Sequence, residues 1–299
     1  MHIKSLKDLL EHAKKYPVKK LAIACAGYYE ILYAIKNISS EFQLKSILIG
    51  RKSDIEKISN KINFAPNSLE IINSEDDLKA CEMAVELVRT KNADILMKGM
   101  ISTGTFLKPV VDRDSGLLKG KLLSHFALFE SPYYHKLLGI ADVAINIAPD
   151  LAAKVEILKN SVEIYHKIGI SNPKVAVITP VETINEKIAS TIDALALTKM
   201  NKNNQINDCI VEGPLALDNA ISKKAAQTKN ITGEVIGDAD ILIVPDLNSG
   251  NILYKTLNFL GGASSASIVA GASVPIVLTS RADSKKCKLM SIALAYVTT

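Results

Sequence analysis

The 299-residue sequence has few aromatic residues, and its positive charge is dispersed. Aromatic residues make up 5% of the chain, Trp is absent, and the formal net charge is only +5. Nucleic-acid binding favours a dense basic stripe with interleaved aromatic residues, so this class of function is not indicated. The scattered charges are typical of a solvated surface that mildly attracts anionic small molecules.

Cysteine and histidine patterns of metal sites are also missing. The four cysteines, Cys25, Cys81, Cys209 and Cys287, are widely separated and form no C-x-x-C pair. The five histidines lack the H-E-x-x-H or i,i+4 spacing of metal ligands. Neither a zinc site nor a disulfide framework is indicated, and we expect no metal and reduced, mostly buried thiols.

No long hydrophobic run is present. Apolar runs such as 21–26 and 241–245 are far shorter than the ~20 residues that a spanning helix needs. The first 20 residues are rich in Lys and lack the apolar segment of a signal peptide. We therefore expect a cytoplasmic protein without a membrane partner.

Hydrophobic residues make up 48% of the chain and charged residues 22%, as in folded globular proteins. Apolar, β-branched runs alternate with segments of helical period, which predicts an α/β fold with a mainly parallel sheet. Because nine strands exceed the usual five or six of one sheet, we expect two α/β/α lobes with a cleft between them. The expected strands are 21–25, 45–49, 94–97, 122–129, 142–147, 174–179, 209–211, 240–244 and 274–279, and the clearest helices are 75–91, 151–168, 186–200 and 284–296.

Ligands of open parallel sheets bind beyond the carboxyl ends of the strands, where helix N-termini favour anions. After the strand 94–97, the segment 98–105 contains a cation, two glycines and three hydroxyl groups. Such a composition is typical of an anion cradle, with Lys98, Ser102 and Thr103 as candidate ligands. A plain helix cap with glycine for the turn is the other interpretation.

Two further junctions carry acidic or amide side chains. Glu182 lies near a predicted helix start, where a carboxylate stabilises the helix dipole or takes part in binding or catalysis. After the strand 240–244 come Asp246, Asn248 and Asn251 around Gly250, which permits close approach of a ligand to the backbone. Their polar density exceeds what a plain turn requires.

The last junction is Ser280-Arg281, which follows the strand 274–279 and precedes a helix. Arg281 is the only arginine in the second half of a chain with four arginines. A guanidinium group binds phosphate or carboxylate in two-pronged geometry, which Lys does not reproduce. The alternative is a structural ion pair with an acid such as Asp283.

In this order, these junctions resemble the phosphate acetyl/butyryltransferase family, closest to its butyryl branch. The resemblance covers nearly the whole chain. Its residues are Glu212-Gly213-Pro214-Leu215-Ala216-Leu217-Asp218-Asn219-Ala220, Val244-Pro245-Asp246-Leu247-Asn248-Ser249-Gly250-Asn251-Ile252-Leu253-Tyr254-Lys255 and Pro275-Ile276-Val277-Leu278-Thr279-Ser280-Arg281-Ala282-Asp283-Ser284.

The resemblance implies two α/β/α domains like those of isocitrate and isopropylmalate dehydrogenases. The first domain would comprise 1–130 and 268–299, the second 131–267, and the chain would form a homodimer. It further implies reversible transfer of a short acyl group, butyryl favoured, between coenzyme A and inorganic phosphate in a ternary complex. No cofactor is implied, since coenzyme A is a substrate.

The resemblance also assigns site residues. Ser280 and Arg281 would bind the phosphate or acyl phosphate. Lys98 is a candidate catalytic cation on a different ground, the anion-cradle composition of the segment 98–105. The family segment that begins with Ser and ends with Arg-Pro matches 102–109, with Lys108 in place of the arginine that contacts a coenzyme A phosphate. Acetyl-branch enzymes carry an Asp, proposed as the base for the thiol, where this sequence has Cys287. In its place, Lys98 or Glu182 would assist deprotonation, or nearby positive charge would favour the thiolate. The glycine that the family often has directly before Ile268-Val269 is replaced by Ser267 in this sequence.

Three alternatives to a butyryltransferase are considered. The first is a phosphate acetyltransferase of the same family. The second is a metal-dependent decarboxylating dehydrogenase, which needs convergent Asp ligands and an arginine cluster that four arginines do not supply. The third is a catalytically silent binding protein on the same fold.

Overall fold

The computed structural model of the chain describes residues 3–39, 41, 43–64, 69–279 and 283–299. The fold is a mixed α/β fold with a large, mostly parallel sheet. The chain divides into two compact units. We call Lys121–Ser265, with Met1–Leu6, the insert unit, and Lys7–Gly120 with Ala266–Thr299 the split unit.

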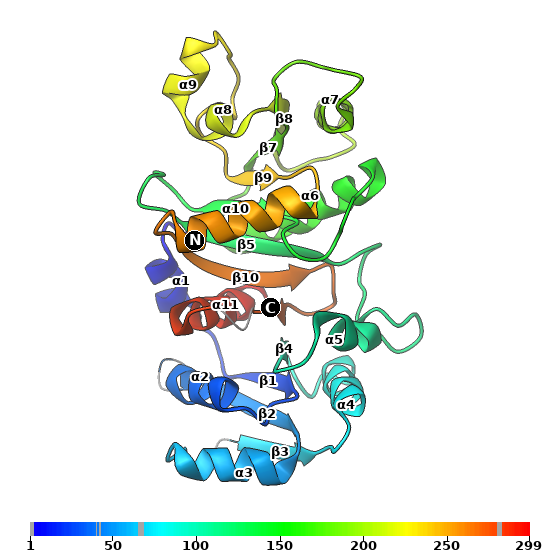
Figure 1. Cartoon of the computed structure of the whole chain (residues 1–299), viewed down its shortest axis with the longest axis vertical. Helices are drawn as coiled ribbons and strands as arrows, with labels where there is room; N and C mark the ends of the chain where they lie inside the picture. The colour runs from blue at the N-terminus through cyan, green and yellow to red at the C-terminus, as the bar shows by residue number, and fades with distance from the viewer. Residues whose placement is uncertain (1–2, 40, 42, 65–68, 280–282) are drawn as a thin grey trace. The chain divides into compact units, whose positions relative to one another are not determined.

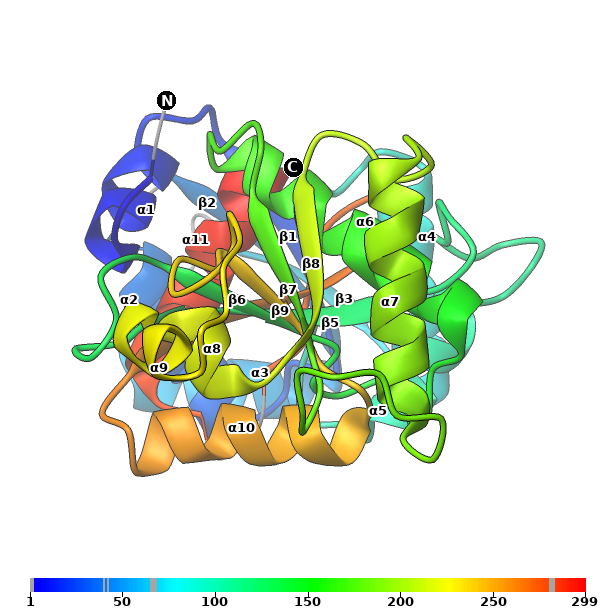
Figure 2. The same ribbon diagram turned by 90° about the horizontal axis from the view of Figure 1, so that it is seen from above.

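The strands of the split unit follow the order β3, β2, β1, β4, β11, β10. All neighbours in this order are parallel except β10 and β11. Helices α2, α3 and α11 lie on one face of these strands and α4 and α5 on the other (Figures 1 and 2). The elements are α1 (Leu6–Ala13), β1 (Lys19–Ala24), α2 (Tyr29–Ser39), β2 (Leu44–Gly50), α3 (Lys52–Lys61), β3 (Leu69–Asn73), α4 (Asp77–Arg89), β4 (Ile95–Lys98), α5 (Thr103–Val110), β10 (Ser264–Ala270), β11 (Ile276–Val277) and α11 (Lys285–Thr298).

The strands of the insert unit follow the order β5, β6, β9, β7, β8, with only the β5–β6 pair antiparallel. Helices α6 and α7 lie on one face, and α8 and α10 on the other (Figures 1 and 2). The elements are β5 (Ser124–Glu130), β6 (Leu138–Ala141), α6 (Leu151–Lys167), β7 (Lys174–Ile178), α7 (Ala189–Lys202), β8 (Ile210–Leu215), α8 (Leu217–Ile221), α9 (Lys223–Thr228), β9 (Ile241–Ile243) and α10 (Leu247–Phe259).

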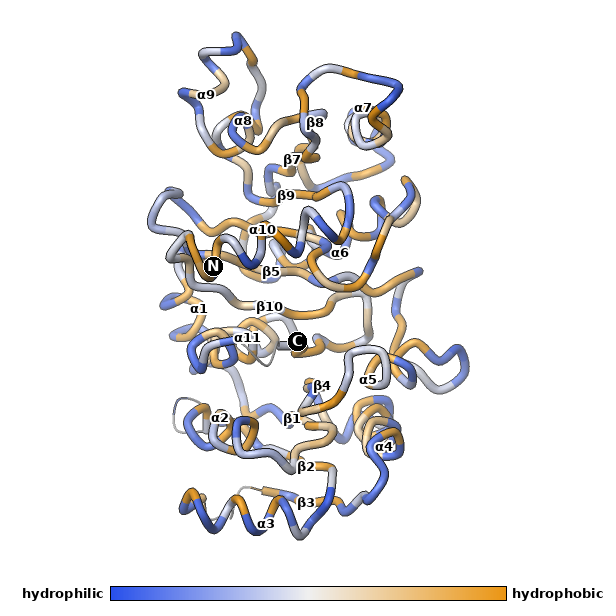
Figure 3. The backbone as a smooth tube through the Cα atoms, in the orientation of Figure 1, coloured by the Kyte–Doolittle hydropathy of each residue, from blue (hydrophilic) through white to orange (hydrophobic). Residues whose placement is uncertain are grey.

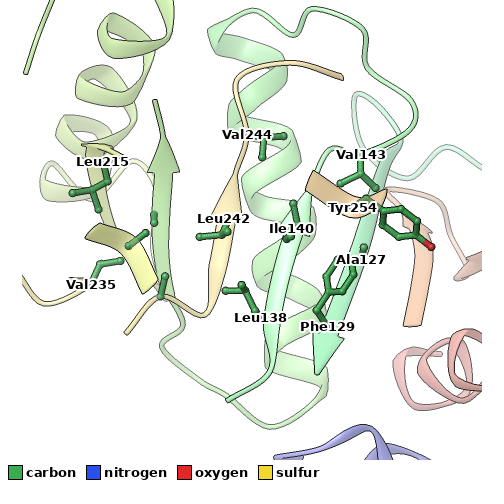
Figure 4. Close-up of a cluster of buried hydrophobic side chains, with 13 residues drawn as sticks. Ala127, Phe129, Leu138, Ile140, Val143, Leu215, Val235, Leu242, Val244 and Tyr254 are labelled. Carbon is green, nitrogen blue, oxygen red and sulfur yellow. The ribbon is translucent and has the colours of Figure 1, made fainter. Parts of the chain in front are cut away.

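Each unit is held together by apolar strands that are covered on both faces. Every residue of β4 and of β9 is buried, which explains why both strands are short apolar runs without alternation. In the insert unit, Leu138, Leu242 and Tyr254 belong to one hydrophobic cluster (Figure 4). Figure 3 shows the contrast between the hydrophobic β9 and the alternating character of α4.

Most predicted elements are confirmed to within a few residues, and one predicted strand is wrong. The segment 142–147 was expected to be a strand, but β6 ends at Ala141. The buried Asp142 carboxylate accepts hydrogen bonds from the backbone N–H groups of Ala144 and Ile145, at 2.8 and 3.0 Å, and so holds a loop. Strands β3, β6 and β10 were not predicted.

The structure also describes the cysteines and the apolar character of the helices. All four cysteines are buried, and none forms a disulfide bond. Among the described residues, no helix combines the length and the apolar composition that a membrane crossing requires.

Candidate active site

The carboxyl ends of β1, β4 and β11 lie at the same edge of the split unit. Ala24 pairs with Lys98, and Val277 pairs with Met97, in parallel register. Loops that follow these strands therefore begin next to one another. This is the edge at which parallel sheets bind ligands, and four of the predicted site residues, Lys98, Ser102, Thr103 and Lys108, lie on the segment that leaves β4.

Glycine is required directly after β4. The Gly99 N–H donates to the Ala24 carbonyl at 2.8 Å. A Cβ atom at Gly99 would lie 2.2 Å from the Cys25 carbonyl oxygen, which no side chain tolerates. This glycine lets the loop pass tightly over the end of β1 and fixes the direction in which the chain continues.

Lys98 is a buried lysine at the end of a buried strand. It is 7% exposed, and its Nζ donates to the carbonyls of Gly99 and Ile101 at 3.2 and 3.0 Å. Lys98 lines a cavity of about 160 Å³ together with Thr279 and Lys288. The structure thus places the predicted catalytic cation at a cavity rather than on the surface.

The next predicted residues form the start of α5. Ser102 is the N-cap of α5, and its Oγ accepts a hydrogen bond from the Thr105 N–H at 3.1 Å. Thr103 is the first residue of the helix and is half-buried. The capping interpretation of this loop is therefore correct for Ser102, alongside any contact with a ligand.

Lys108 is exposed in the last turn of α5 and lines a larger cavity. This cavity has a volume of about 750 Å³ and is formed mainly by α4, α5 and the turn after α5. Its lining includes apolar groups such as Leu78, Met83 and Pro109. A volume of several hundred cubic ångströms is typical of sites for small organic ligands.

Two predicted residues, Ser280 and Arg281, lie outside the described residues. The flanking segments are described. Thr279 is buried, and Ser284 caps α11 by accepting a hydrogen bond from the Cys287 N–H at 3.1 Å. Cys287, at the position of the acetyl-branch aspartate, is 6% exposed in the first turn of that helix.

Glu182 lies in the insert unit, after β7, in an ion pair. Its carboxylate accepts hydrogen bonds from Lys229 Nζ, at 2.6 Å, and from Asn219 Nδ2. Lys229 also pairs with Asp218 at 3.1 Å. The hydrogen bond from Lys229 lowers the pKa of the Glu182 carboxyl below its ordinary value. Glu182 is therefore an ionised group at neutral pH and a poor acceptor for a thiol proton.

The polar residues around Gly250 form the start of α10. Asp246 is the N-cap, and its carboxylate accepts from the Ser249 N–H at 2.9 Å, which lowers the pKa of Asp246. A Cβ at Gly250 would lie 2.3 Å from the Asp142 carbonyl oxygen. Asn251 Nδ2 donates to the Val143 carbonyl at 3.1 Å, whereas Asn248 is exposed. Capping and helix packing account for most of this polar density.

Sequence reasoning missed Lys288, the second buried lysine of the small cavity. Lys288 is 7% exposed, and its Nζ donates to the Asp283 carbonyl at 2.6 Å. The sequence feature that could have identified Lys288 is its position in the helical pattern of α11. Lys288 falls four residues after the cap Ser284 and four before the buried Ile292, on the buried face of α11.

The family model for phosphate acetyl/butaryl transferase matches residues 77–296, and the chain therefore belongs to this family of acyltransferases. The chain is 45% identical to the phosphate butyryltransferase of Clostridium acetobutylicum over 98% of this chain and 97% of that protein. It is 40% identical to the phosphate acetyltransferase of Thermotoga maritima, over 93% and 95%. A branched-chain phosphotransacylase from Enterococcus faecalis has a similar structure, with a TM-score of 0.83 and 35% identity over 94% and 98% of the two chains.

Proposed function

We propose that this chain catalyses reversible transfer of a butyryl or similar four-carbon acyl group between coenzyme A and inorganic phosphate. The observation that carries the proposal is the 45% identity, over almost the full length of both chains, to a phosphate butyryltransferase. The buried lysine at the carboxyl edge of β4 supports it, because the reaction needs a cationic site for phosphate.

The chemistry is a direct displacement in a ternary complex. The coenzyme A thiolate attacks the carbonyl carbon of the acyl phosphate, so a C–S bond forms and the C–O bond to phosphate breaks. The bonding electron pair leaves with the phosphate oxygen. Arg281 and Ser280 bind the phosphate, and Lys98 contributes a further positive charge to the developing anion.

The thiol loses its proton without a dedicated carboxylate in this proposal. Cys287 replaces the acetyl-branch aspartate, and the pKa of Glu182 is lowered by Lys229. Nearby cations lower the pKa of a thiol, so positive charge at the site promotes thiolate formation. The proton then passes to solvent or to the departing phosphate.

Coenzyme A would contact the segment that leaves β4. We place a phosphate of the coenzyme on Lys108, with Ser102 and Thr103 as neighbouring ligands. The cavity of about 750 Å³ that Lys108 lines supports this placement. Glu182, Asp246, Asn248, Gly250 and Asn251 form a second proposed set of substrate contacts, in addition to their structural roles.

Acyl-chain preference tests the function. Initial rates of thiol release would be measured with acetyl-, propionyl-, butyryl- and isobutyryl-coenzyme A in the presence of phosphate. We expect the highest kcat/KM for the four-carbon substrates. A clear preference for acetyl-coenzyme A would instead identify a phosphate acetyltransferase. The 40% identity to the phosphate acetyltransferase of Thermotoga maritima is the observation that favours this alternative. No thiol release with any substrate would identify a silent binding protein.

The remaining proposals concern organisation. The two compact units support a two-lobed protein like isocitrate and isopropylmalate dehydrogenases. The proposed domains are 1–130 plus 268–299 and 131–267, whereas the compact units group 1–6 and 121–130 with the insert unit. Exposed apolar side chains at α10 support a homodimer, since Ile252, Phe259 and Leu260 are 66%, 65% and 85% exposed. We propose a cytoplasmic location, where both substrates are available.

A further inference from the structure

The small cavity of the split unit is lined by two buried lysines from different elements. Lys98 ends β4, and Lys288 lies in the first turns of α11, which contacts α2. Both lysines are 7% exposed. The other lining residues are Glu30, Ile31, Gly99, Met100 and Thr279.

The charge of Lys288 is not balanced by a carboxylate within the part of the chain that the structure describes. Its Nζ donates to the Asp283 carbonyl at 2.6 Å, which uses one of three donors of the ammonium group. Glu30 also lines the cavity, but its side chain is exposed, and among the described residues it forms no ion pair with Lys288. A buried ammonium group is costly unless an opposite charge accompanies it.

Two cations at one cavity repel each other, and an anion between them removes that repulsion. The cavity volume of about 160 Å³ is too small for a nucleotide but suits a compact anion. We propose that Lys288, together with Lys98, binds the phosphate that the enzyme uses as substrate and releases as product. This inference rests on the proposed function and adds to it a substrate-binding residue that no motif marks.

The role of Lys288 follows from the direction of charge transfer. When the C–O bond of the acyl phosphate breaks, the electron pair moves to the phosphate oxygen and the phosphate gains negative charge. The Lys288 ammonium group stabilises that charge, as it stabilises bound inorganic phosphate in the reverse direction. Because it contacts the phosphate and not the coenzyme, its removal should affect the two substrates differently.

Lys288→Gln tests this, because the amide keeps a donor for the Asp283 carbonyl and removes the charge. We expect the KM for phosphate to rise about 10- to 100-fold, with the KM for butyryl-coenzyme A within about twofold. Lys288→Arg should keep the KM for phosphate closer to that of wild type. The matched control is Lys286→Gln, on the exposed side of the same helix, which should leave both constants unchanged.

Phosphate binding is also measured without turnover, as the rise in Tm that inorganic phosphate causes. We expect Lys288→Gln to lose this rise and Lys286→Gln to keep it. If wild type transfers no acyl group but shows a Tm rise that depends on Lys288, the proposed function fails and the phosphate site stands. An unchanged KM and Tm rise in Lys288→Gln would overturn the site.

A measurement on the wild type covers the case in which Lys288→Gln does not fold. An amine-specific reagent would modify the protein with and without inorganic phosphate, and mass spectrometry would quantify the modification of each lysine. Slower modification of Lys288 in phosphate, with that of Lys286 unchanged, supports the site. Equal modification of Lys288 in both conditions contradicts it.

Discussion

The ammonium group of Lys154 lies 2.6 Å from the carboxylate of Asp193 and so ties α6 to α7 in the insert unit. The Lys154 side chain is only 6% exposed. Removing one partner of a buried ion pair leaves an uncompensated charge and costs about 3–5 kcal/mol. We expect Lys154→Met to lower the free energy of unfolding by about 3 kcal/mol, as measured by urea unfolding.

Two further variants separate the ion pair from general effects of losing a lysine. The double variant Lys154→Met/Asp193→Leu should recover much of the lost stability, since no buried charge remains. Lys159→Met, which removes an exposed lysine of the same helix, should cost less than about 0.5 kcal/mol. Equal effects of Lys154→Met and Lys159→Met would show that the ion pair is not structural.

Glu182→Gln should leave the pH dependence of activity unchanged. The hydrogen bond from Lys229 lowers the pKa of Glu182, so the carboxyl is already ionised at the pH values where thiols begin to ionise. The pH profile of kcat/KM would be recorded from pH 6 to 9 for wild type, for Glu182→Gln and for Lys229→Met, which removes the ion-pair partner of Glu182. A shifted limb in Glu182→Gln alone would show that Glu182 takes part in proton transfer.

Asp238 should contribute to stability in a manner that is lost in acid. Burial by itself would raise its pKa, but hydrogen bonds from Lys174, His135 and Lys136 outweigh burial and hold the pKa well below its ordinary value. A depressed folded-state pKa stabilises the protein above the unfolded-state pKa of about 4, and this stabilisation disappears as the pH falls further.

The comparison is between wild type and Asp238→Asn. We expect wild type to be the more stable protein at pH 7 and the difference in free energy of unfolding to shrink between about pH 5 and pH 2. Denaturant unfolding at several pH values measures this difference. The contributions of the other carboxylates cancel in the difference, because both proteins contain them. A difference that stays constant with pH would contradict the assignment.

Arg281→Ala should reduce kcat/KM by about 100-fold or more, because a charged contact to the transferring phosphate is lost. Arg281→Lys keeps the charge but not the planar fork, and it should also be severely impaired. Circular dichroism and Tm should change little in either variant. Arg113→Ala, at an exposed arginine, is the matched control. Near wild-type turnover of Arg281→Ala, or its failure to fold, would move the active site elsewhere.

The sequence predicted several strands that are buried on both faces, although it missed the fully buried β6 and placed a strand at 142–147 instead. β1, β4 and β9 are continuous apolar runs, and such runs are conspicuous in any sequence. The strand β10 was missed because serines interrupt it, although Ser265 and Ser267 are buried. The Ser267 N–H donates to Ser291 Oγ at 2.9 Å, a tertiary contact that no local pattern reveals.

The candidate site shows the same division between local and tertiary information. Loops after strands identified Lys98 and the cap Ser102, because position in a βα unit is a local property. The local sequence pattern could not show whether Asp246 caps a helix or binds a ligand, since both roles use a carboxylate at a helix start. Nor could local pattern bring Lys288 and Lys98 to one cavity, which requires the packing of α11 on β11, the neighbour of β4 in the sheet.

The two-residue strand β11 has a consequence for synthesis. It pairs with β4 on one side and with β10 on the other, yet it follows β4 by some 180 residues of sequence. While the ribosome translates the insert unit, β4 therefore exposes an unpaired apolar edge that is open to other chains. The split unit becomes complete only after the whole insert unit has been translated, so this edge of β4 is open to misassembly or to chaperone binding throughout that interval.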